Sequence, residues 1–187
     1  MKKNLIITAV VVLVLLTVFW FIRGLNFAVI LDENVKSTWA QVENQLQRRN
    51  DLIPNLVKTV KAYASHEKEL FSEVTRLRNQ WTQAQTTTAK IDTAQAMGGV
   101  LSRLLLVAES YPDLKASQNF LTLQSQLEGT ENRLAVERMR YNQAVQLFNS
   151  YQRTVFGSLF TKLRSLTEPA VYFEPEEGAK QKPSVEF

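Results

Sequence analysis

Residues 39–81 read WAQVENQLQRRNDLIPNLVKTVKAYASHEKELFSEVTRLRNQW and contain no glycine and a single proline, Pro54. Every seventh position from Trp39 is apolar at six of seven places, and Glu67 is the exception. A companion series that starts at Val42 is apolar at five of six places, with Arg49 as its exception. Two apolar seams at this spacing predict an amphipathic helix, and we expect one helix over residues 34–82.

Pro54 interrupts the hydrogen bonding of this predicted helix. Its ring displaces the carbonyl of Asn50 and removes one backbone bond, so we expect a helix kink at Pro54. The kink would let a long helix wrap around its neighbours. The alternative is a ligand site, formed by the freed carbonyl with the side chains of Asp51 and Asn55.

Two further helices are predicted downstream. Thr86–Thr88 reads as a turn, and a second helix is expected from about Thr88 to Ser110. Gly98-Gly99 should lower the stability of this helix locally, because glycine has a low helix propensity. Tyr111-Pro112-Asp113 should end that helix and start the next, with Asp113 as N-cap. The third helix carries apolar residues at strict seven-residue spacing from Phe120 to Val155, and Gly157 is expected to mark its fraying end.

An apolar run at residues 5–22 precedes these helices, and its only polar members are Thr8 and Thr17. Eighteen helical residues span about 27 Å, which is close to the thickness of a bilayer's hydrocarbon core. We therefore expect a single membrane-spanning helix, represented by Leu5, Val12, Leu16, Trp20 and Ile22. The alternative is a cleaved signal peptide, but the run is longer than a usual signal core and lacks a small-x-small cleavage site.

The net charge of +4 is concentrated around this run. Without Lys2, Lys3 and Arg23 the chain has 19 basic and 18 acidic residues, so no basic stripe for nucleic acid is predicted. The positive-inside rule places the N-terminus in the cytoplasm and the bulk of the chain outside it, although the cytoplasmic side stays open.

The chain has no cysteine and one histidine. This excludes disulfides, thiolate catalysis and multi-histidine metal sites, and no cofactor is expected. His66-Glu67 lacks the second histidine of a zinc-protease helix, because position 70 is Leu70. We interpret His66 as a solvated helix residue; the alternative is a metal or acid–base site.

The chain changes composition at Glu168: the last 20 residues hold three of the five prolines. Proline at this density cannot continue a helix. Tyr172, Phe173 and Phe187 are apolar points in this tail that we expect to dock onto another surface.

Several motifs of this chain together resemble the LemA family. They are the run from Trp39 to Val57, the pairs Val60-Lys61 and His66-Glu67, YPDLK at 111–115, EGTENR at 128–133, Tyr141-Asn142, and YFE at 172–174 with Pro183 and Phe187. Two departures are Ala62, where the family often has glycine, and Gly157, where it often has proline.

The resemblance covers nearly the whole chain. It implies a bacterial protein with one N-terminal membrane helix and a long antiparallel helical bundle, often found in the company of membrane metalloproteases. It also implies a bulk domain on the cytoplasmic side, opposite to the charge count, so the orientation stays open.

The charged exceptions to the seams need partners if they are buried. Arg49 and Glu67, 18 residues apart, would be about 27 Å apart on one helix and could not pair. Arg138 lies on the seam of the third helix, so a Glu67–Arg138 pair is one option and snorkelling at the bundle edge is the other. We take as candidates for the core or for assembly Trp39, Arg49, Glu67, Trp81, Arg138 and Tyr141.

The predicted fold is all-α: an N-terminal transmembrane helix, a long antiparallel three- to four-helix bundle and an extended C-terminal tail. The expected divisions are an anchor at 1–23, a helical connector at 24–38, the bundle at 39–166 and a Pro/Glu-rich tail at 167–187. We predict an inner-membrane, single-pass, homo-oligomeric scaffold that contacts membrane lipid. The alternatives are an accessory subunit of a membrane enzyme, such as a quality-control metalloprotease, and an enzyme in its own right.

Overall fold

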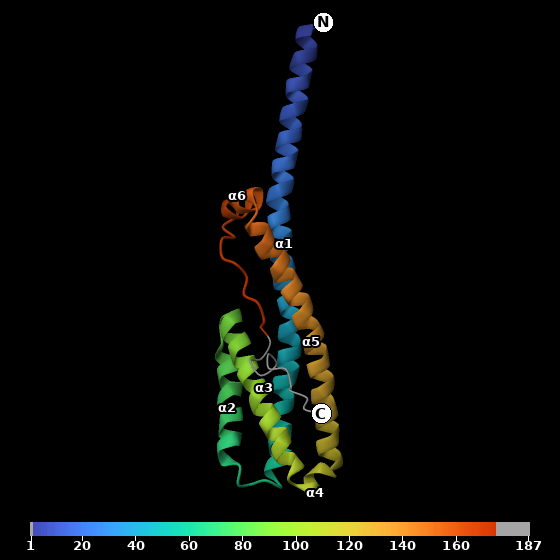
Figure 1. The fold of residues 1–187 in the computed structure, drawn as a ribbon, viewed down its shortest axis with the longest axis vertical. Helices are drawn as coiled ribbons and strands as arrows, with labels where there is room; N and C mark the ends of the chain where they lie inside the picture. The colour runs from blue at the N-terminus through green and yellow to red at the C-terminus, as the bar shows by residue number, and fades with distance from the viewer. Residues whose placement is uncertain (1, 175–187) are drawn as a thin grey trace, which may run out of the picture. The chain divides into compact units, whose positions relative to one another are not determined.

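The computed structural model describes residues 2–174, and over this range the chain is helical with no strand (Figure 1). The helices are α1 (Lys2–Lys61), α2 (Lys68–Gln83), α3 (Thr87–Glu109), α4 (Pro112–Lys115), α5 (Gln118–Gln152) and α6 (Val155–Leu163). The predicted all-α class, with a long apolar N-terminal helix and a helical bundle, is confirmed.

The chain forms two compact units, which we describe separately. The N-terminal unit is Met1–Trp39 with Arg140–Ala170, and the central unit is Ala40–Met139 with Val171–Phe187. Each unit combines segments that are distant in the sequence. The linear division into 1–23, 24–38, 39–166 and 167–187 stays a prediction.

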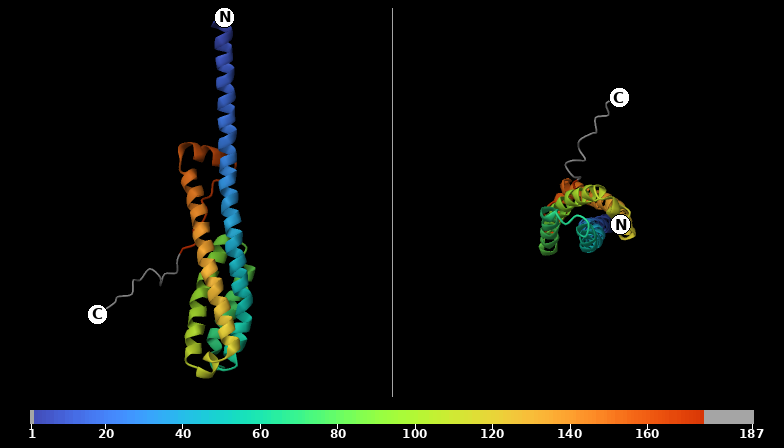
Figure 2. Two further views of the ribbon diagram at one scale, coloured as in Figure 1. Left: turned by 90° about the vertical axis from the view of Figure 1, so that its right-hand side faces the viewer. Right: turned by 90° about the horizontal axis from the view of Figure 1, so that it is seen from below.

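The central unit is a helical bundle in which α2 and α3 pack side by side (Figures 1 and 2). Its core takes the predicted seam residues Ile53, Leu56 and Val60 from α1. The other helices contribute Val74 and Leu77 from α2, Met97, Val100, Leu101 and Leu104 from α3, Leu114 from α4, and Phe120 and Leu127 from α5. The apolar periodicity therefore identified these core positions, but the seam residues Tyr63 and Val155 are exposed, at 44% and 84%.

The expectation of one helix over residues 34–82 is wrong, because the chain leaves the helix between Lys61 and Lys68. The amides of Tyr63 and Ala64 both donate to the carbonyl of Val60, and Ala64 is fully buried. The break lets α2 bury its own apolar face in the same core as α1. Both helices contribute apolar side chains to that core, including Ile53 and Val60 from α1 and Val74 and Leu77 from α2.

Helix α3 begins one residue before its predicted start and ends one residue before its predicted end. Thr86 is its N-cap, and its hydroxyl accepts a hydrogen bond from the amide of Ala89 at 3.2 Å. The N-cap of α4 is Tyr111, and Asp113 lies inside the first turn, so the assignment of Asp113 as N-cap is wrong. Proline favours the first helical position because its missing N–H needs no partner there, and this sets the start of α4 at Pro112.

The third predicted helix does not continue to Val155, since α5 ends at Gln152 and α6 begins after Thr154. The hydroxyl of Thr154 accepts a hydrogen bond from the Gly157 amide at 3.0 Å and caps α6. Gly157 is not a fraying point: it is buried, and a Cβ there would lie 1.9 Å from the carbonyl oxygen of Tyr151. Only glycine fits this turn without displacing backbone.

Helix α6 is followed by a left-handed residue, Ser165, with φ of 57°. The Leu166 amide donates to the Thr161 carbonyl at 2.8 Å, which is the closing bond of a Schellman motif. The following segment is fixed to α5, because the side chain of Asn149 both donates to and accepts from the backbone of Ala170, at 2.9 and 2.8 Å. The start of the tail is therefore non-helical and is hydrogen-bonded to α5.

Candidate functional site

The apolar run at residues 5–22 forms the first part of α1, and every one of its side chains is exposed. The exposed fraction of its large apolar side chains ranges from 73% at Leu5 to 38% at Phe21, and Val12, Leu16, Trp20 and Ile22 lie between these values. The hydroxyls of Thr8 and Thr17 donate to the carbonyls of Asn4 and Leu13 at 3.0 and 2.8 Å. The two polar side chains are thus satisfied inside the helix, as a hydrocarbon environment requires.

Among residues 2–174, α3 is the other helix long and apolar enough to cross a membrane. It carries seven buried residues, and several of them belong to the core of the central unit. We therefore assign α3 to the bundle and α1 to the candidate membrane span.

Helix α6 packs crossways against α1 at the end of the apolar run (Figure 2). The Phe160 ring contacts the rings of Trp20 and Phe21, each with a centroid separation of 5.5 Å, and the Phe156 ring centroid lies 4.9 Å from that of Trp20. Gly24 makes this approach possible, because a Cβ there would lie 2.3 Å from the Phe160 ring. Sequence reasoning missed this helix, although Gly157 and the apolar pattern of residues 155–163 signal it.

The aromatic packing continues along α1 of the N-terminal unit. The Tyr151 ring centroid lies 5.1 Å from that of Phe27, and the Tyr151 hydroxyl donates to the Gly24 carbonyl at 3.3 Å. Burial raises the pKa of Tyr151. Further along α1, Trp39 packs on Tyr141 at 5.3 Å between ring centroids, and Tyr141 is 2% exposed. Desolvation by this burial raises the pKa of Tyr141 to about 12.

Arg49 is buried in the central unit, with 3% of its side chain exposed. Its Nη2 donates to the Ala94 carbonyl at 2.7 Å, and its Nη1 donates to the Glu131 carboxylate at 3.1 Å. The guanidinium therefore connects α1 to α3 and to α5. The alternative that Arg49 snorkels at the bundle edge is therefore wrong, and its partners lie on other helices. No sequence pattern distinguishes Glu131 from the other acidic residues.

Trp81 is also buried, at 8% exposure, and the Lys90 ammonium lies over its ring at 5.8 Å from the centroid. Lys90 forms an ion pair with Glu43, which connects α3 to α1. Trp81 thus belongs to the core of the bundle rather than to a free surface.

Glu67 and Arg138, the two residues of the suggested ion pair, lie at the start of α2 and within α5. Glu67 is half-buried and stands at the N-cap position of α2, where its side chain makes no capping hydrogen bond. Arg138 is half-buried on α5, and its guanidinium stacks on the Phe173 ring at 4.2 Å from the centroid. The prediction that Arg49 and Glu67 lie on one helix is wrong, because Arg49 lies within α1 and Glu67 precedes α2.

The tail residues that we expected to dock onto another surface differ in how far they are buried. Phe173 is 2% exposed beneath Arg138, whereas Tyr172 is 41% exposed. Gln95 of α3 donates to the Glu174 carbonyl at 2.8 Å, so this part of the tail lies on α3 and α5 of the central unit. Phe187 lies outside the described residues.

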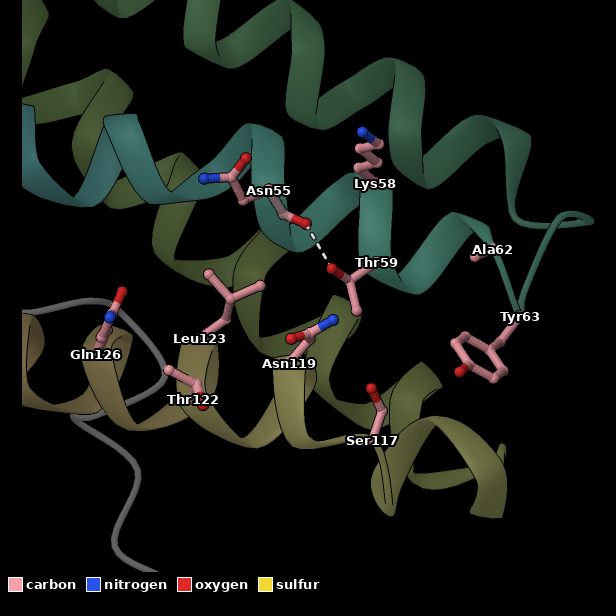
Figure 3. A pocket seen from close by; sticks show the side chains of 10 residues that line it. All are labelled: Asn55, Lys58, Thr59, Ala62, Tyr63, Ser117, Asn119, Thr122, Leu123 and Gln126. Carbon is pink, nitrogen blue, oxygen red and sulfur yellow. Dashed lines mark hydrogen bonds between the residues drawn. The ribbon is translucent and has the colours of Figure 1, made fainter.

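Pro54 lies inside α1, and the helix continues past it to Lys61. Beside it is an open groove of about 580 Å³ between the end of α1 and the start of α5 (Figure 3). Most residues of its walls have polar side chains, and the Thr59 hydroxyl donates to the Asn55 carbonyl at 2.9 Å. Lys58 is its charged wall residue. The predicted kink and the alternative ligand site both remain predictions.

His66 is exposed in the connection between α1 and α2, so its expected position inside a helix is wrong. Within residues 2–174, no three side chains of histidine, aspartate or glutamate are grouped closely enough to hold a metal ion. The features that stand out from the geometry are the exposed apolar segment, the α6 contact beside it and the buried arginine of the bundle.

Comparison with known proteins gives consistent results. Residues 38–187 match the profile of the LemA family. The magnetosome protein MamQ 2 of Paramagnetospirillum magneticum is 25% identical over 171 residues, which cover 75% of this chain and 63% of that protein. Protein LemA of Metamycoplasma hominis is 21% identical over 158 residues, which cover 83% of this chain and 72% of that protein. The chain thus spans less than two thirds of the MamQ relative, and because the profile covers most of its length, it belongs to the LemA family.

Proposed function

We propose that this protein is a non-catalytic, single-pass scaffold of the bacterial inner membrane that assembles as a homo-oligomer. The observation that carries the proposal is the exposed apolar run at residues 5–22 of α1. A contiguous apolar surface of this size is not stable in water and needs lipid or protein to cover it. Its length of about 27 Å matches the hydrocarbon core of a bilayer.

The ends of the run support a membrane anchor. Lys2 and Lys3 precede it, and Trp20 lies near its other end, where an indole ring suits the interface between lipid and water. Helix α1 runs without interruption from Lys2 to Lys61, so the anchor and the first helix of the bundle belong to a single element.

The proposal of self-assembly rests on apolar surface beyond the run. Ala28 and Leu31 are buried within the N-terminal unit, but Phe27 and Ile30 remain 46% and 61% exposed. Sister copies can cover these side chains through a symmetric contact. The names of the relatives refer to a magnetosome protein and to LemA, and neither name states a reaction.

A second candidate function is an accessory subunit of a membrane enzyme. It is favoured by the open groove at the end of α1, where the Tyr63 side chain is 44% exposed at the rim. An exposed aromatic side chain beside polar groups is typical of a protein-binding surface.

The experiment uses the absence of native cysteine. Ile30→Cys and the control Leu106→Cys are expressed in full-length chains, since Ile30 and Leu106 are similarly exposed, at 61% and 65%. We expect both proteins to resist alkaline extraction from membranes, and we expect disulfide-linked dimers from the Ile30→Cys variant but not from the Leu106→Cys variant. If the bulk of the chain lies outside the cytoplasm, as the positive-inside rule predicts, a membrane-impermeant maleimide should label the Leu106→Cys variant in intact spheroplasts.

Each outcome decides one part of the proposal. Release of the protein by alkali would refute the membrane anchor. A monomer in mild detergent, with no cross-link in the Ile30→Cys variant, would refute self-assembly, and a complex with a different protein would favour the accessory-subunit alternative. Labelling of the Leu106→Cys variant only after lysis would place the bundle in the cytoplasm and refute the charge-based orientation.

A further inference from the structure

We infer that α6 is an interfacial helix that lies on an anionic lipid surface at the end of the membrane span. This inference rests on the proposed anchor and adds a second, separate membrane contact. It starts from four apolar side chains of α6 that the protein leaves uncovered. Val155, Phe156, Leu159 and Leu163 are 84%, 56%, 47% and 56% exposed.

These four side chains form one face. At about 100° per residue in an α-helix they fall within an arc of about 100°. Phe160, Gly157 and Thr161 occupy the neighbouring arc and are buried within the N-terminal unit. The protein therefore covers one side of α6 and leaves the adjacent apolar side open.

The contacts of α6 set its level along α1. Phe156 and Phe160 touch Trp20, Phe160 touches Phe21, and the Phe160 ring lies over Gly24. Trp20 and Phe21 are among the last residues of the apolar run, and Gly24 follows its end. If the run spans the hydrocarbon core, α6 lies where acyl chains meet headgroups, which is where amphipathic helices bind.

The charges of this region complement an anionic surface. Arg153, Lys162 and Arg164 lie in or beside α6, and all three are exposed. Residues 150–167 contain no acidic side chain, and neither do residues 1–31, which include Arg23. Basic residues beside an apolar face are typical of helices that bind acidic lipid headgroups. A symmetric contact of α6 with the α6 of a sister copy would bring Arg153, Lys162 and Arg164 close to their own counterparts, so we favour lipid as the occupant of this face.

The test measures depth in the bilayer with spin labels on single cysteines of the full-length chain. Leu159→Cys reports α6, Leu13→Cys reports the span, and Asn34→Cys on α1 reports the aqueous side. The proteins are reconstituted into phosphatidylcholine vesicles with and without phosphatidylglycerol. The readout is the ratio of collisions with oxygen to collisions with a water-soluble nickel chelate, which rises with depth.

We expect the ratio at position 159 to lie between those at positions 13 and 34, and to rise when phosphatidylglycerol is present. The double variant Lys162→Gln/Arg164→Gln should lose that rise. The control Lys68→Gln/Arg78→Gln on α2, with the same change of net charge, should keep it.

The outcomes separate the two proposals. A water-like ratio at position 13 would refute the anchor itself. A lipid-like ratio at 13 with a water-like ratio at 159 would refute the interfacial helix and leave the anchor intact. Protection of position 159 from both oxygen and nickel chelate would show that a second copy covers α6, which would also overturn the inference. An unchanged ratio at 159 on adding phosphatidylglycerol would refute the preference for anionic lipid.

Discussion

At the scale of single residues, Arg49 places a buried charge inside the bundle. Its guanidinium is almost fully removed from water and is satisfied by a carbonyl of α3 and a carboxylate of α5. Charge-assisted hydrogen bonds between three helices fix their register, because a shift of one helix would leave the charge unpaired.

We predict that Arg49→Ala lowers the free energy of unfolding by about 2–4 kcal/mol, through lost hydrogen bonds and lost packing. The neighbouring Arg48 is exposed, so Arg48→Ala should change it by less than about 0.5 kcal/mol. Denaturant unfolding followed by circular dichroism measures both variants. Equal unfolding midpoints would contradict a structural role for Arg49.

Tyr141 gives a pH-dependent prediction. Its pKa is raised from 10.0 to about 12 in the folded protein by desolvation, so the folded state holds the phenol proton more tightly than the unfolded state. The resulting stability is present below about pH 10 and is lost as the pH rises through about 12. Tyr141→Phe cannot ionise, so its stability should fall less over this interval than that of the original protein. Parallel pH dependences for the two proteins would show that Tyr141 does not ionise in this range.

At the scale of elements, the contact between α1 and α6 depends on one missing methyl group. A Cβ at Gly24 would overlap the Phe160 ring, whereas a Cβ at Gly99 in α3 would meet nothing within 4 Å. Glycine is therefore required at the first position and only tolerated at the second.

We predict that Gly24→Ala destabilises the protein by about 1–3 kcal/mol, because the Phe160 ring must move. Gly99→Ala should instead stabilise it by up to about 1 kcal/mol, since alanine is the better helix former. Thermal unfolding in detergent compares the two, and Phe160→Leu in the Gly24→Ala background should recover part of the loss. If both alanine variants were stabilised, the close packing at Gly24 would be disproved.

The breaks between helices show which helix boundaries can be predicted from local sequence and which cannot. The turn predicted at Thr86–Thr88 and the boundary predicted at Tyr111-Pro112-Asp113 both lie close to observed helix starts, although the capping residues are Thr86 and Tyr111 rather than Asp113. The break after Lys61 has no glycine or proline to signal it. Apolar residues spaced seven apart fit one long helix and also fit two helices facing one core, so periodicity could not decide between them.

At the scale of the whole molecule, each compact unit is built from segments that lie far apart in the chain. Helix α1 supplies residues to both units, and so does α5. Sequence composition separates an apolar start, a helical middle and a proline-rich end. It does not indicate that residues 140–170 return to pack on the first 39. That pairing depends on contacts between segments more than 100 residues apart, such as the one between Tyr151 and Gly24.

The amino-acid sequence alone was enough to establish the all-α class, the apolar run, the faces that form the core and the resemblance to the LemA family. The structural properties among these follow from hydrophobicity and helical period, which act over a few turns. Tertiary packing, by contrast, determined where α1 and α5 end. It also determined that Arg49 pairs with Glu131 and the Ala94 carbonyl, and that α6 packs against Gly24. Those outcomes depend on which distant side chains can be buried and hydrogen-bonded together, and the local sequence does not contain that information.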